Sequence, residues 1–374
     1  MGSAYVPGLK VNPATELELE RRLPLKGQVM VEKGQRVAHD HIVARTELPG
    51  NVEMVNVANK LGLEPKEVPQ AMFFQVGQSV EKGAIMAQNR GFFGLFKGSL
   101  ESPITGTVEE ISAITGQVLL RRPPVPVEVA AYVDGTVVEI MPDEGVRIKS
   151  FGAHLQGIFG IGGETSGELA VLAARPDAQL QPSDLKPEHS GKVVVGGSLV
   201  TGPFLKECRK VGVAGVIVGG IHDRDLRDFL GYDLGVAITG SEKLGVTLII
   251  TEGFGPIRMA ERTWKLLTAN AGRRASISGA TQIRAGVIRP EVFIPRDPGD
   301  AGQAPSGSAA VGLDPGAPVR IIREPHFGAL AKVVELPVEL TGIPTEARVR
   351  VAVLELEDGT RTTVPRANLE LIEE

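Results

Sequence analysis

Apolar and polar residues alternate at a spacing of two through much of the first half of the chain, in short runs between glycines. Some of these runs are repeated. Val31–Ala44 aligns without gaps to Phe74–Ala87, and Ile104–Gly116 aligns to Val133–Gly145. A period of two places successive side chains on opposite faces of a strand, and repeated strand–turn units pack as sandwiches or barrels. Residues 1–174 are therefore predicted to form a β-rich region built from duplicated units.

The pattern changes after about residue 190, where short apolar runs alternate with longer amphipathic segments. The apolar runs indicate buried strands, at 192–195, 215–218, 235–238 and 246–250. The longer segments have helical periodicity, at 198–211, 223–229 and 256–269. Short buried strands that alternate with helices are typical of a mostly parallel sheet that is covered on its faces. Residues 191–295 are therefore predicted to form a three-layer α/β domain.

Two stretches lack apolar periodicity and are rich in Pro, Gly, Ser, Asp and Ala, namely 175–190 and 296–312. Such segments bury too little apolar surface to offset their ordering entropy, so both are predicted as linkers, the second a flexible one. The predicted chain is thus multidomain. It has β-rich regions at both ends, the second at 313–374, and an α/β domain between them.

The order VGQSVEKGAIMA, a connecting loop and then SPITGTVEEISAITGQVLL resembles the barrel-sandwich hybrid of biotinyl and lipoyl domains. The C subunit of the Rnf electron-transport complex also uses this hybrid. The resemblance implies that half-motifs interlock within about residues 25–150. Carriers of this family bear a prosthetic group on a lysine between the halves, and Lys97 is the only lysine in that loop. Its neighbours differ from the family's modification motif, so a modified-lysine carrier is kept as an alternative and no cofactor is predicted.

The same loop carries three of the sixteen aromatic residues of the chain within five positions, Phe92, Phe93 and Phe96. Glycines and two positive charges flank them. These rings either fold back onto the β-rich region or form a protruding patch for a partner. The loop is therefore a candidate partner-binding site.

Glycine and apolar residues recur at characteristic places near the C-terminus, which are Gly316, Val319, Ile321, Phe327, Gly328 and Val333. An Asp358-Gly359 pair independently indicates a hairpin. This pattern resembles the KOW module, a small SH3-like barrel of transcription-elongation factors and ribosomal proteins. Such modules bind RNA or another protein, and glutamates offset the basic residues here, so both kinds of partner stay open. The candidate partner-binding residues of the module are Phe327, Arg320 and Arg323.

Charge and cysteine content exclude several classes of protein. Lys and Arg number 40 and Asp and Glu 45, so the net charge of −5 creates no overall field that attracts nucleic acid or an anionic membrane. The single cysteine, Cys208, excludes a disulfide framework, a cysteine-ligated zinc site and a cysteine-held iron–sulfur cluster. No metal site is predicted. The first residues do not form a basic and then apolar leader, and no apolar run has a membrane-spanning length, so we predict a cytoplasmic protein without membrane contact.

Candidate chemistry in the central domain lies in the turns that follow its strands, because ligands of such sheets bind at the carboxyl ends of the strands. His222 and Asp223 lie together on one of these turns, and Glu252 lies on another. An imidazole beside carboxylates suits acid–base chemistry or metal binding. Asp223 equally suits a helix N-cap. These three residues are the catalytic candidates.

Two arginines, Arg284 and Arg289, stand among small and apolar residues. They either pair with carboxylates such as Glu252 or Glu291 or bind an anion. Glycine-rich turns next to the strands add backbone donors, although the serines in them also suit helix N-caps. The ligand-binding candidates are Gly196, Gly197, Ser198, Gly240, Ser241, Gly253, Arg284 and Arg289.

These features lead to one principal hypothesis and two alternatives. We expect a non-enzymatic binding or assembly protein that presents its β-barrel modules to a larger cytoplasmic complex, of the transcription or translation machinery. The first alternative is an enzyme or a small-molecule sensor with its site at the strand ends of the central domain. The second alternative is the modified-lysine carrier.

Overall fold

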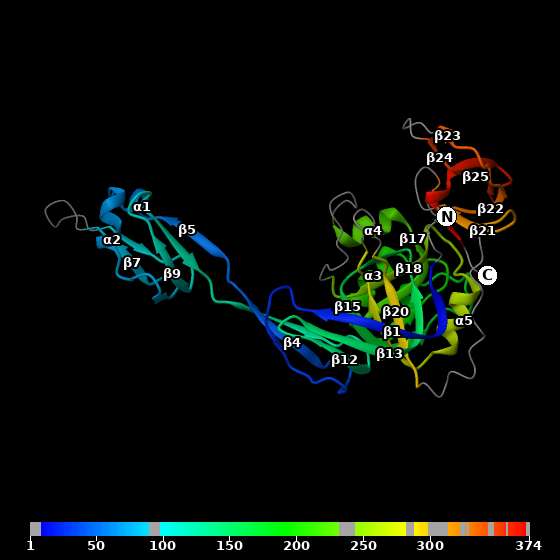
Figure 1. Cartoon of the computed structure of the whole chain (residues 1–374), viewed down its shortest axis with the longest axis horizontal. Coiled ribbons are helices and arrows are strands. Elements are labelled where there is room, and N and C mark those ends of the chain that lie inside the picture. The colour runs from blue at the N-terminus through cyan, green and yellow to red at the C-terminus, as the bar shows by residue number, and fades with distance from the viewer. Residues whose placement is uncertain are drawn as a thin grey trace.

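The computed structural model describes residues 9–89, 98–231, 244–281, 288–297, 313–321, 326, 329–342, 348–356 and 358–371. The protein is rich in strands, which form several sheets, and its helices are short. Figure 1 shows a main body from which one lobe projects to the left, while the C-terminal strands lie at the upper right. Buried apolar side chains of the described residues gather in five separate clusters, so the fold has several cores.

One large sheet forms the main body. Ten of its strands follow one another in space as β14 (Phe159–Ile161), β18 (Thr247–Phe254), β17 (Gly215–Ile221), β16 (Val193–Val195), β15 (Glu164–Val171), β19 (Arg274–Ser278), β20 (Glu291–Pro295), β13 (Gly145–Gln156), β12 (Gly135–Met141) and β3 (Arg36–Val37). An eleventh, β1 (Val11–Arg22), pairs with β13. The four strands β15 to β18 pair in parallel. The valine-rich β16 and the neighbouring β17 are buried at every position, as is typical of parallel strands covered on both faces.

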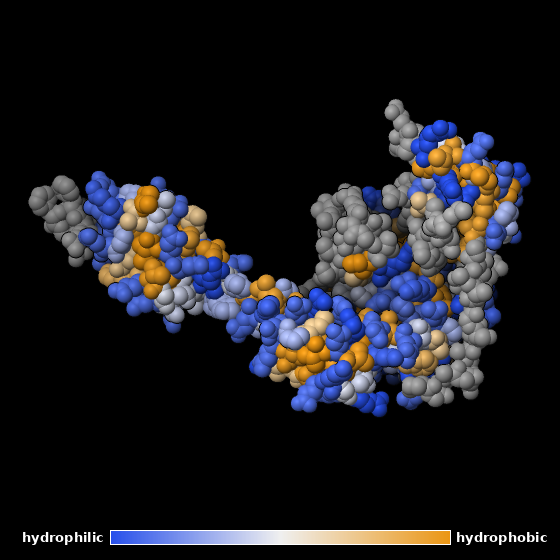
Figure 2. All heavy atoms as spheres, viewed as in Figure 1, coloured by the Kyte–Doolittle hydropathy of each residue, from blue (hydrophilic) through white to orange (hydrophobic). Residues whose placement is uncertain are grey.

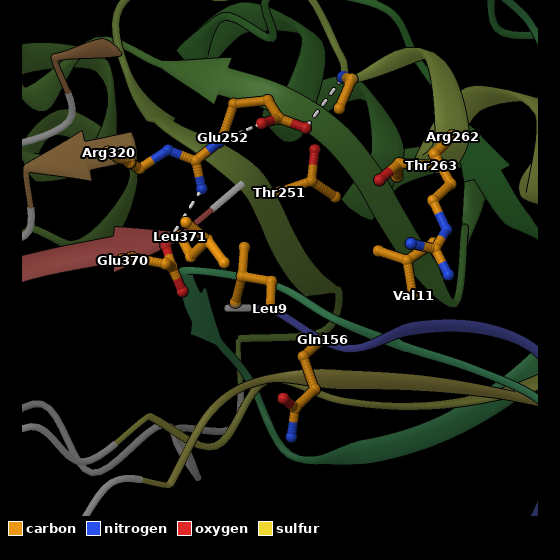
Figure 3. A pocket seen from close by; sticks show the side chains of 11 residues that line it. Leu9, Val11, Gln156, Thr251, Glu252, Arg262, Thr263, Arg320, Glu370 and Leu371 are labelled. Carbon is orange, nitrogen blue, oxygen red and sulfur yellow. Dashed lines mark hydrogen bonds and ion pairs between the residues drawn. The ribbon is translucent and has the colours of Figure 1, made fainter. Parts of the chain in front are cut away.

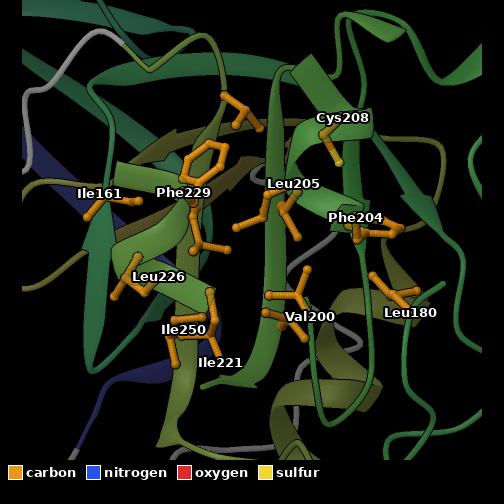
Figure 4. Close-up of a cluster of buried hydrophobic side chains, with 14 of the residues drawn as sticks. Ile161, Leu180, Val200, Phe204, Leu205, Cys208, Ile221, Leu226, Phe229 and Ile250 are labelled. Carbon is orange, nitrogen blue, oxygen red and sulfur yellow. The ribbon is translucent and has the colours of Figure 1, made fainter. Parts of the chain in front are cut away.

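Helices pack against both faces of the parallel strands. On one face, α3 (Gly202–Val211) and α4 (Asp223–Leu230) bury Phe204, Leu205 and Phe229 against the sheet (Figure 4). On the other face, α5 (Glu261–Ala269) buries Leu267. Cys208 of α3 is fully buried, and this burial raises the pKa of its thiol to about 12. The lone cysteine is therefore a packing residue of this core.

Two helices begin later than their sequence patterns predict. Helix α3 starts at Gly202 instead of residue 198, because Thr201 is extended and its hydroxyl accepts a hydrogen bond from the Phe204 N–H at 3.4 Å. Helix α5 starts at Glu261 instead of residue 256. The predicted strand at 235–238 lies outside the described residues.

The range 175–190, predicted as a linker, runs between two neighbouring strands of the large sheet. It joins β15 to β16, which pair in parallel, and it contains short turns at Pro182–Asp184 and Pro187–His189. Leu180 is 1% exposed and packs in the same cluster as α3. The range differs from the prediction because one apolar anchor and its backbone hydrogen bonds fix a polar segment to the sheet.

The remaining elements of the first half form the projecting lobe and its base. They are β2 (Gln28–Val29), β4 (Ile42–Leu48), β5 (Val52–Asn56), α1 (Val57–Leu61), α2 (Val68–Ala71), β6 (Ser79–Val80), β7 (Ile85–Gln88), β8 (Ser99–Glu101), β9 (Gly106–Ile111), β10 (Gln117–Arg121) and β11 (Val125–Ala130). We call β1–β4 with β11–β13 the outer unit and β5–β10 the inner unit. The outer unit has the strand order β1-β13-β12-β3 and a second layer of β11, β4 and β2, and the inner unit has the order β5-β10-β9-β6 and a second layer of β7 and β8. The two units thus have the same design.

Strand register confirms that the sequence repeats occupy equivalent places in the two units. Val80 pairs with Gly106 in the inner unit, as Val37 pairs with Gly135 in the outer unit. The ladder between β9 and β10 shifts register just after Val108, and the ladder between β12 and β13 shifts at the equivalent place. The repeats therefore encode the same local pairing, including its irregularity.

Glycines close the same turn in both units. Gly34 and Gly77 have φ of +87° and +88°, a region that favours glycine because it has no Cβ. The N–H of Gly34 donates to the carbonyl of Val137 at 2.7 Å, and that of Gly77 donates to the carbonyl of Val108 at 2.8 Å. These turns link the two half-motifs of each unit.

The repeats fail to match at one predicted pair, Gly116 and Gly145. Gly145 pairs with Met141 in the ladder, whereas Gly116 lies in a turn and donates to the carbonyl of Ser112 at 2.9 Å. Six residues separate the paired Ile111 and Val118 in the inner unit, whereas five separate the equivalent pair Ile140 and Val146 in the outer unit. An alignment without gaps cannot show this difference in length.

The inner unit is inserted into a hairpin of the outer unit. Leu48 of β4 and Val125 of β11 are direct partners, so everything between them projects from the end of this pair (Figure 1). The same hairpin of the inner unit lies between Gln88 of β7 and Ser99 of β8, which also pair. The tip of that hairpin, with the candidates Phe92, Phe93, Phe96 and Lys97, lies outside the described residues.

The C-terminal strands form a separate small antiparallel sheet. Its order is β26 (Arg361–Pro365), β25 (Val351–Leu356), β22 (Leu330–Glu335), β21 (Pro318–Ile321) and β27 (Leu369–Leu371), with a short extra pair of β23 (Thr341–Gly342) and β24 (Arg348–Val349). The predicted hairpin at Asp358-Gly359 is confirmed between β25 and β26. We call 313–371 the C-terminal unit. Its buried apolar cluster contains residues of this unit alone.

The nested arrangement predicts that the inner unit can be removed as a whole. We expect a chain in which an Asn-Gly turn replaces residues 49–124 to fold, because Leu48 and Val125 are already partners and Asn-Gly favours a two-residue hairpin. The apolar cluster of the inner unit shares no member with the others, so their burial is unchanged. Calorimetry should give a melting temperature within about 4 °C of that of the full chain.

A deletion of 49–88 is the control for this experiment. It removes β5, β6 and β7 and leaves the other half of the inner unit without partners, so we expect aggregation or loss of cooperative unfolding. Failure of the 49–124 deletion to fold would contradict the nested arrangement.

Candidate functional site

Glu252 lies near the carboxyl end of β18, where its side chain points toward the start of α5. It is 4% exposed, and its Oε1 accepts a hydrogen bond from the N–H of Ala260 at 2.9 Å. Ala260 immediately precedes α5, so the carboxylate satisfies a backbone donor at the positive end of the helix dipole. Among the catalytic candidates, Glu252 is the one that the structure buries.

The other oxygen of Glu252 is held by a residue of the C-terminal unit. The Nη2 of Arg320 donates to Glu252 Oε2, and its Nη1 donates to Glu370 Oε2 at 3.3 Å (Figure 3). Arg320 and Glu370 are themselves direct partners in the β21–β27 ladder. Arg289, just before β20, places its Nη1 2.8 Å from Glu370 Oε1. Two guanidinium groups and two carboxylates therefore form one ionic cluster without net charge.

This ionic cluster, defined by Glu252, Arg289, Arg320 and Glu370, is almost completely buried. The exposed fraction of the side chains ranges from 1% for Glu370 to 12% for Arg289. Removing charges from water is costly, and only mutual pairing with good hydrogen bonds offsets this cost. Arg320 Nε is buried without a hydrogen-bond partner, so the compensation is incomplete. Burial raises the pKa of Glu370, although Arg289 and Arg320 oppose this shift.

A small pocket of about 40 Å³, partly open to solvent, lies beside the ionic cluster. Figure 3 shows Arg320 and Glu370 at one side, Thr251 and Thr263 at another, and Leu9 between them. The pocket thus combines hydroxyl groups, charges and apolar surface near the carboxyl end of a parallel strand, where ligands of such sheets bind. Its residues are Leu9, Val11, Gln156, Thr251, Glu252, Ala260, Arg262, Thr263, Arg320, Glu370 and Leu371.

The three catalytic candidates do not converge on this pocket. Asp223 is the first residue of α4 and pairs with Arg227 one turn later. His222, and not Asp223, occupies the N-cap position of α4, and its side chain is exposed and makes no capping hydrogen bond. Neither residue lines the pocket beside Glu252.

The glycine-rich turn after β16 is filled by the chain itself. A Cβ on Gly197 would lie 2.4 Å from the carbonyl oxygen of Ala178, and one on Gly196 would lie 2.6 Å from Leu180. The hydroxyl of Ser198 donates to the carbonyl of Asp177 at 2.7 Å. These three ligand-binding candidates therefore hold the 175–190 connection against the sheet. Gly253, within β18, has φ of +153° and continues the strand toward Phe254.

Of the two candidate arginines, Arg289 pairs with a carboxylate, but with Glu370 instead of Glu252 or Glu291. Glu291 is 3.1 Å from Nε2 of His154. The remaining candidates lie outside the described residues, which are Gly240, Ser241, Arg284, Arg323 and Phe327.

A second polar cluster, which sequence reasoning missed and which is partly exposed, joins the outer unit to the main sheet. Arg21 of β1 binds both carboxylate oxygens of Glu164 at 2.7 and 2.6 Å, and its guanidinium lies 5.4 Å from the ring centroid of Tyr132. Tyr132 has φ of +72°, and burial raises the pKa of its hydroxyl well above 10. Ser276 donates to the Tyr132 carbonyl. This cluster aligns strands from distant parts of the sequence.

Within the described parts of the chain, no group of three or more His, Cys, Asp or Glu residues is arranged to hold a metal ion. None of the helices there has the length and hydrophobicity needed to cross a membrane. No protein-family model matches the chain, and a search of curated proteins finds no match either. The ionic cluster and its pocket are therefore interpreted from their own chemistry.

The raised pKa of Glu370 predicts how the free energy of unfolding depends on pH. Because its pKa is raised above the ordinary value of 4.5, the folded protein binds this proton more tightly than the unfolded chain does. The contribution of Glu370 to the free energy of unfolding therefore falls as pH rises through the window from 4.5 to the raised pKa. In urea titrations, Glu370→Gln should remove this decline, so the wild type should lose stability relative to the variant as pH rises.

An exposed glutamate provides the control. Glu355 pairs with Arg361 on the surface of the same unit, and Glu355→Gln should leave the pH profile parallel to that of the wild type. A wild type that gains stability relative to Glu370→Gln with rising pH would contradict the assignment.

Proposed function

We propose that the chain is a binding or assembly protein that presents its β-modules to a larger complex, of the transcription or translation machinery in the cytoplasm. The observation that carries this proposal is the inner unit, which projects from the body at the end of one strand pair (Figure 1). A unit with its own apolar cluster adds nothing to the cores of the body. Its placement favours contact with another molecule.

Exposed apolar side chains are concentrated on the inner unit, which supports the proposal. Of twelve large apolar residues that are exposed in the described part of the chain, six belong to this unit: Val52, Met54, Phe73, Val76, Ile85 and Ile114. Figure 2 shows apolar surface on the face of the projecting lobe. Exposed apolar surface that is gathered on one part of a protein is typical of an interaction site.

The fold families remain part of the proposal. We infer barrel-sandwich hybrids for the inner and outer units, from the interlocked half-motifs and the two-layer strand order. We infer an SH3-like KOW barrel for the C-terminal unit, from its five antiparallel strands in which the first and last are neighbours. A three-layer α/β domain is inferred for the centre, from the parallel strands with helices on both faces.

Affinity purification from a native lysate tests the proposal. We expect the full chain to enrich one defined assembly, such as RNA polymerase or ribosomal particles, by mass spectrometry. The double variant Met54→Glu/Phe73→Glu should reduce this recovery by about tenfold or more, because both side chains are 60% exposed on the inner unit and a buried charge at an interface is costly.

Val338→Glu is the matched control, since this apolar side chain is 87% exposed on the C-terminal unit. It should leave recovery unchanged if the inner unit makes the contact. Loss of recovery after nuclease treatment would assign the contact to RNA. A full chain recovered alone would overturn the proposal.

The pocket favours a second candidate function, that of a small-molecule sensor or an enzyme. It lies near the end of β18 and at the start of α5, and it offers hydroxyl groups from Thr251 and Thr263. In a thermal-shift screen of metabolites, a ligand at 100 times its Kd should stabilise the protein by about 2.7 kcal/mol. Thr263→Val should abolish the shift, whereas Thr363→Val on the exposed face of β26 should not. A screen without any shift would remove this candidate.

A further inference from the structure

The C-terminal unit contacts the rest of the protein through charged groups, while its apolar core is its own. The nine buried residues of its cluster all fall between Val319 and Leu371. Between described residues, the ion pairs Arg320–Glu252 and Arg289–Glu370 connect it to the body. Interfaces with separate cores and polar contacts are typical of units that can separate while each stays folded.

Separation of the two bodies leaves most of the buried charges with a partner. Arg320 keeps Glu370, because the two are neighbours in the β21–β27 ladder. Glu252 keeps the N–H of Ala260 and the helix α5 beyond it. Opening separates two ion pairs, so Arg289 loses its carboxylate and Glu252 loses its guanidinium. Each body nevertheless keeps at least one of the polar contacts of the ionic cluster.

The closed state carries a desolvation cost for its buried charges, and opening of the C-terminal unit removes this cost. Three of the four side chains of the ionic cluster are at most 5% exposed, and Arg320 Nε is without a hydrogen-bond partner. Buried charge pairs return little net stability because desolvation opposes their attraction. A contact of this kind fixes one geometry but stabilises the closed state only a little relative to the open state. A small difference in free energy allows both states to be populated.

We propose that the C-terminal unit is a reversible lid over the carboxyl end of β18, and that the pair Arg320–Glu252 is its latch. In the closed state, Arg320, Glu370 and Leu371 form one wall of the pocket (Figure 3). In the open state, the pocket loses that wall and Arg320 becomes available to a partner. This inference is independent of whether the protein binds an assembly or a small molecule.

The lid also explains why a partner-binding candidate is buried. Arg320 is one of the residues through which the KOW resemblance places partner contacts, yet it is 3% exposed here. The Arg320 guanidinium donates to the carboxylate of Glu252, a residue of the same chain. A partner that binds Arg320 through a carboxylate or a phosphate has to displace Glu252, so the closed state is autoinhibited.

Distance measurements between spin labels test the latch. Labels are placed at Lys332→Cys on the C-terminal unit and Lys265→Cys on α5, both exposed, while the buried native Cys208 stays unlabelled. We expect one dominant short distance in the otherwise wild-type protein. Glu252→Gln and Arg320→Met should each raise the population of longer distances by about tenfold or more, because the first removes the carboxylate that holds Arg320 to the body and the second leaves the buried Glu252 without its guanidinium. Circular dichroism of both variants should match that of the wild type.

Two further variants make the outcome decisive. The double variant Glu252→Gln/Arg320→Met should restore a larger closed population than Arg320→Met alone, because it removes both charges of the pair together. Arg361→Gln breaks an exposed pair within the C-terminal unit and should leave the distances unchanged. If neither single change alters the distances, or if the unit opens only when the whole protein unfolds, the lid is overturned.

If the single variants do not fold, a measurement that leaves Arg320 and Glu252 unchanged tests the lid. Thr263 lines the pocket and is 3% exposed, so the thiol of Thr263→Cys reacts with a maleimide only when the pocket opens. We expect a reaction much faster than that of Cys208, whose exposure needs global unfolding. Equal rates for the two thiols would overturn the lid.

Discussion

One strand, β13, belongs to two structures at once, and the arrangement of the molecule depends on it. Its first residues, near Ile148, pair with β12 and pack in the core of the outer unit. Its last residues, Ala153 and Leu155, pair with β20 and pack in the core of the main sheet. From Gly145 to Leu155 it pairs with β1, with one register shift near Gly152. This long backbone ladder therefore fixes the outer unit to the body, and the inner unit is fixed to the outer one.

The sequence predicts the local part of this arrangement well. Alternation and repeated glycines locate the half-motifs, and the register of Val37 and Val80 follows from them. The nesting does not follow, because it depends on the pairing of Leu48 with Val125 across the whole inner unit. The same limit explains the linker predicted at 175–190. Its composition is that of a linker, and only the distant partner of Leu180 makes it part of the sheet.

The site was predicted in part for the same reason. The carboxyl end of β18 and Glu252 follow from the rule for parallel sheets. The partners of Glu252 come from the C-terminal unit, which the sequence places beyond a predicted linker. Glu370 carried one signal: it stands between Leu369 and Leu371 in a strand, where alternation places it on the opposite face from its neighbours. All three are buried, so that opposite face is covered, and the cover is the body itself.

The insertion of one unit into a hairpin of the other also determines how such a protein can be extended. The inner unit lies at the end of the pair β4–β11 of the outer unit, and the inner unit has the equivalent end at β7–β8. An insertion at this end leaves every ladder and every core beneath it intact, since the two flanking residues are already partners. The length of the projecting lobe can therefore increase by one whole unit at a time. In each unit, the end of the equivalent strand pair is the place where a further unit can be inserted.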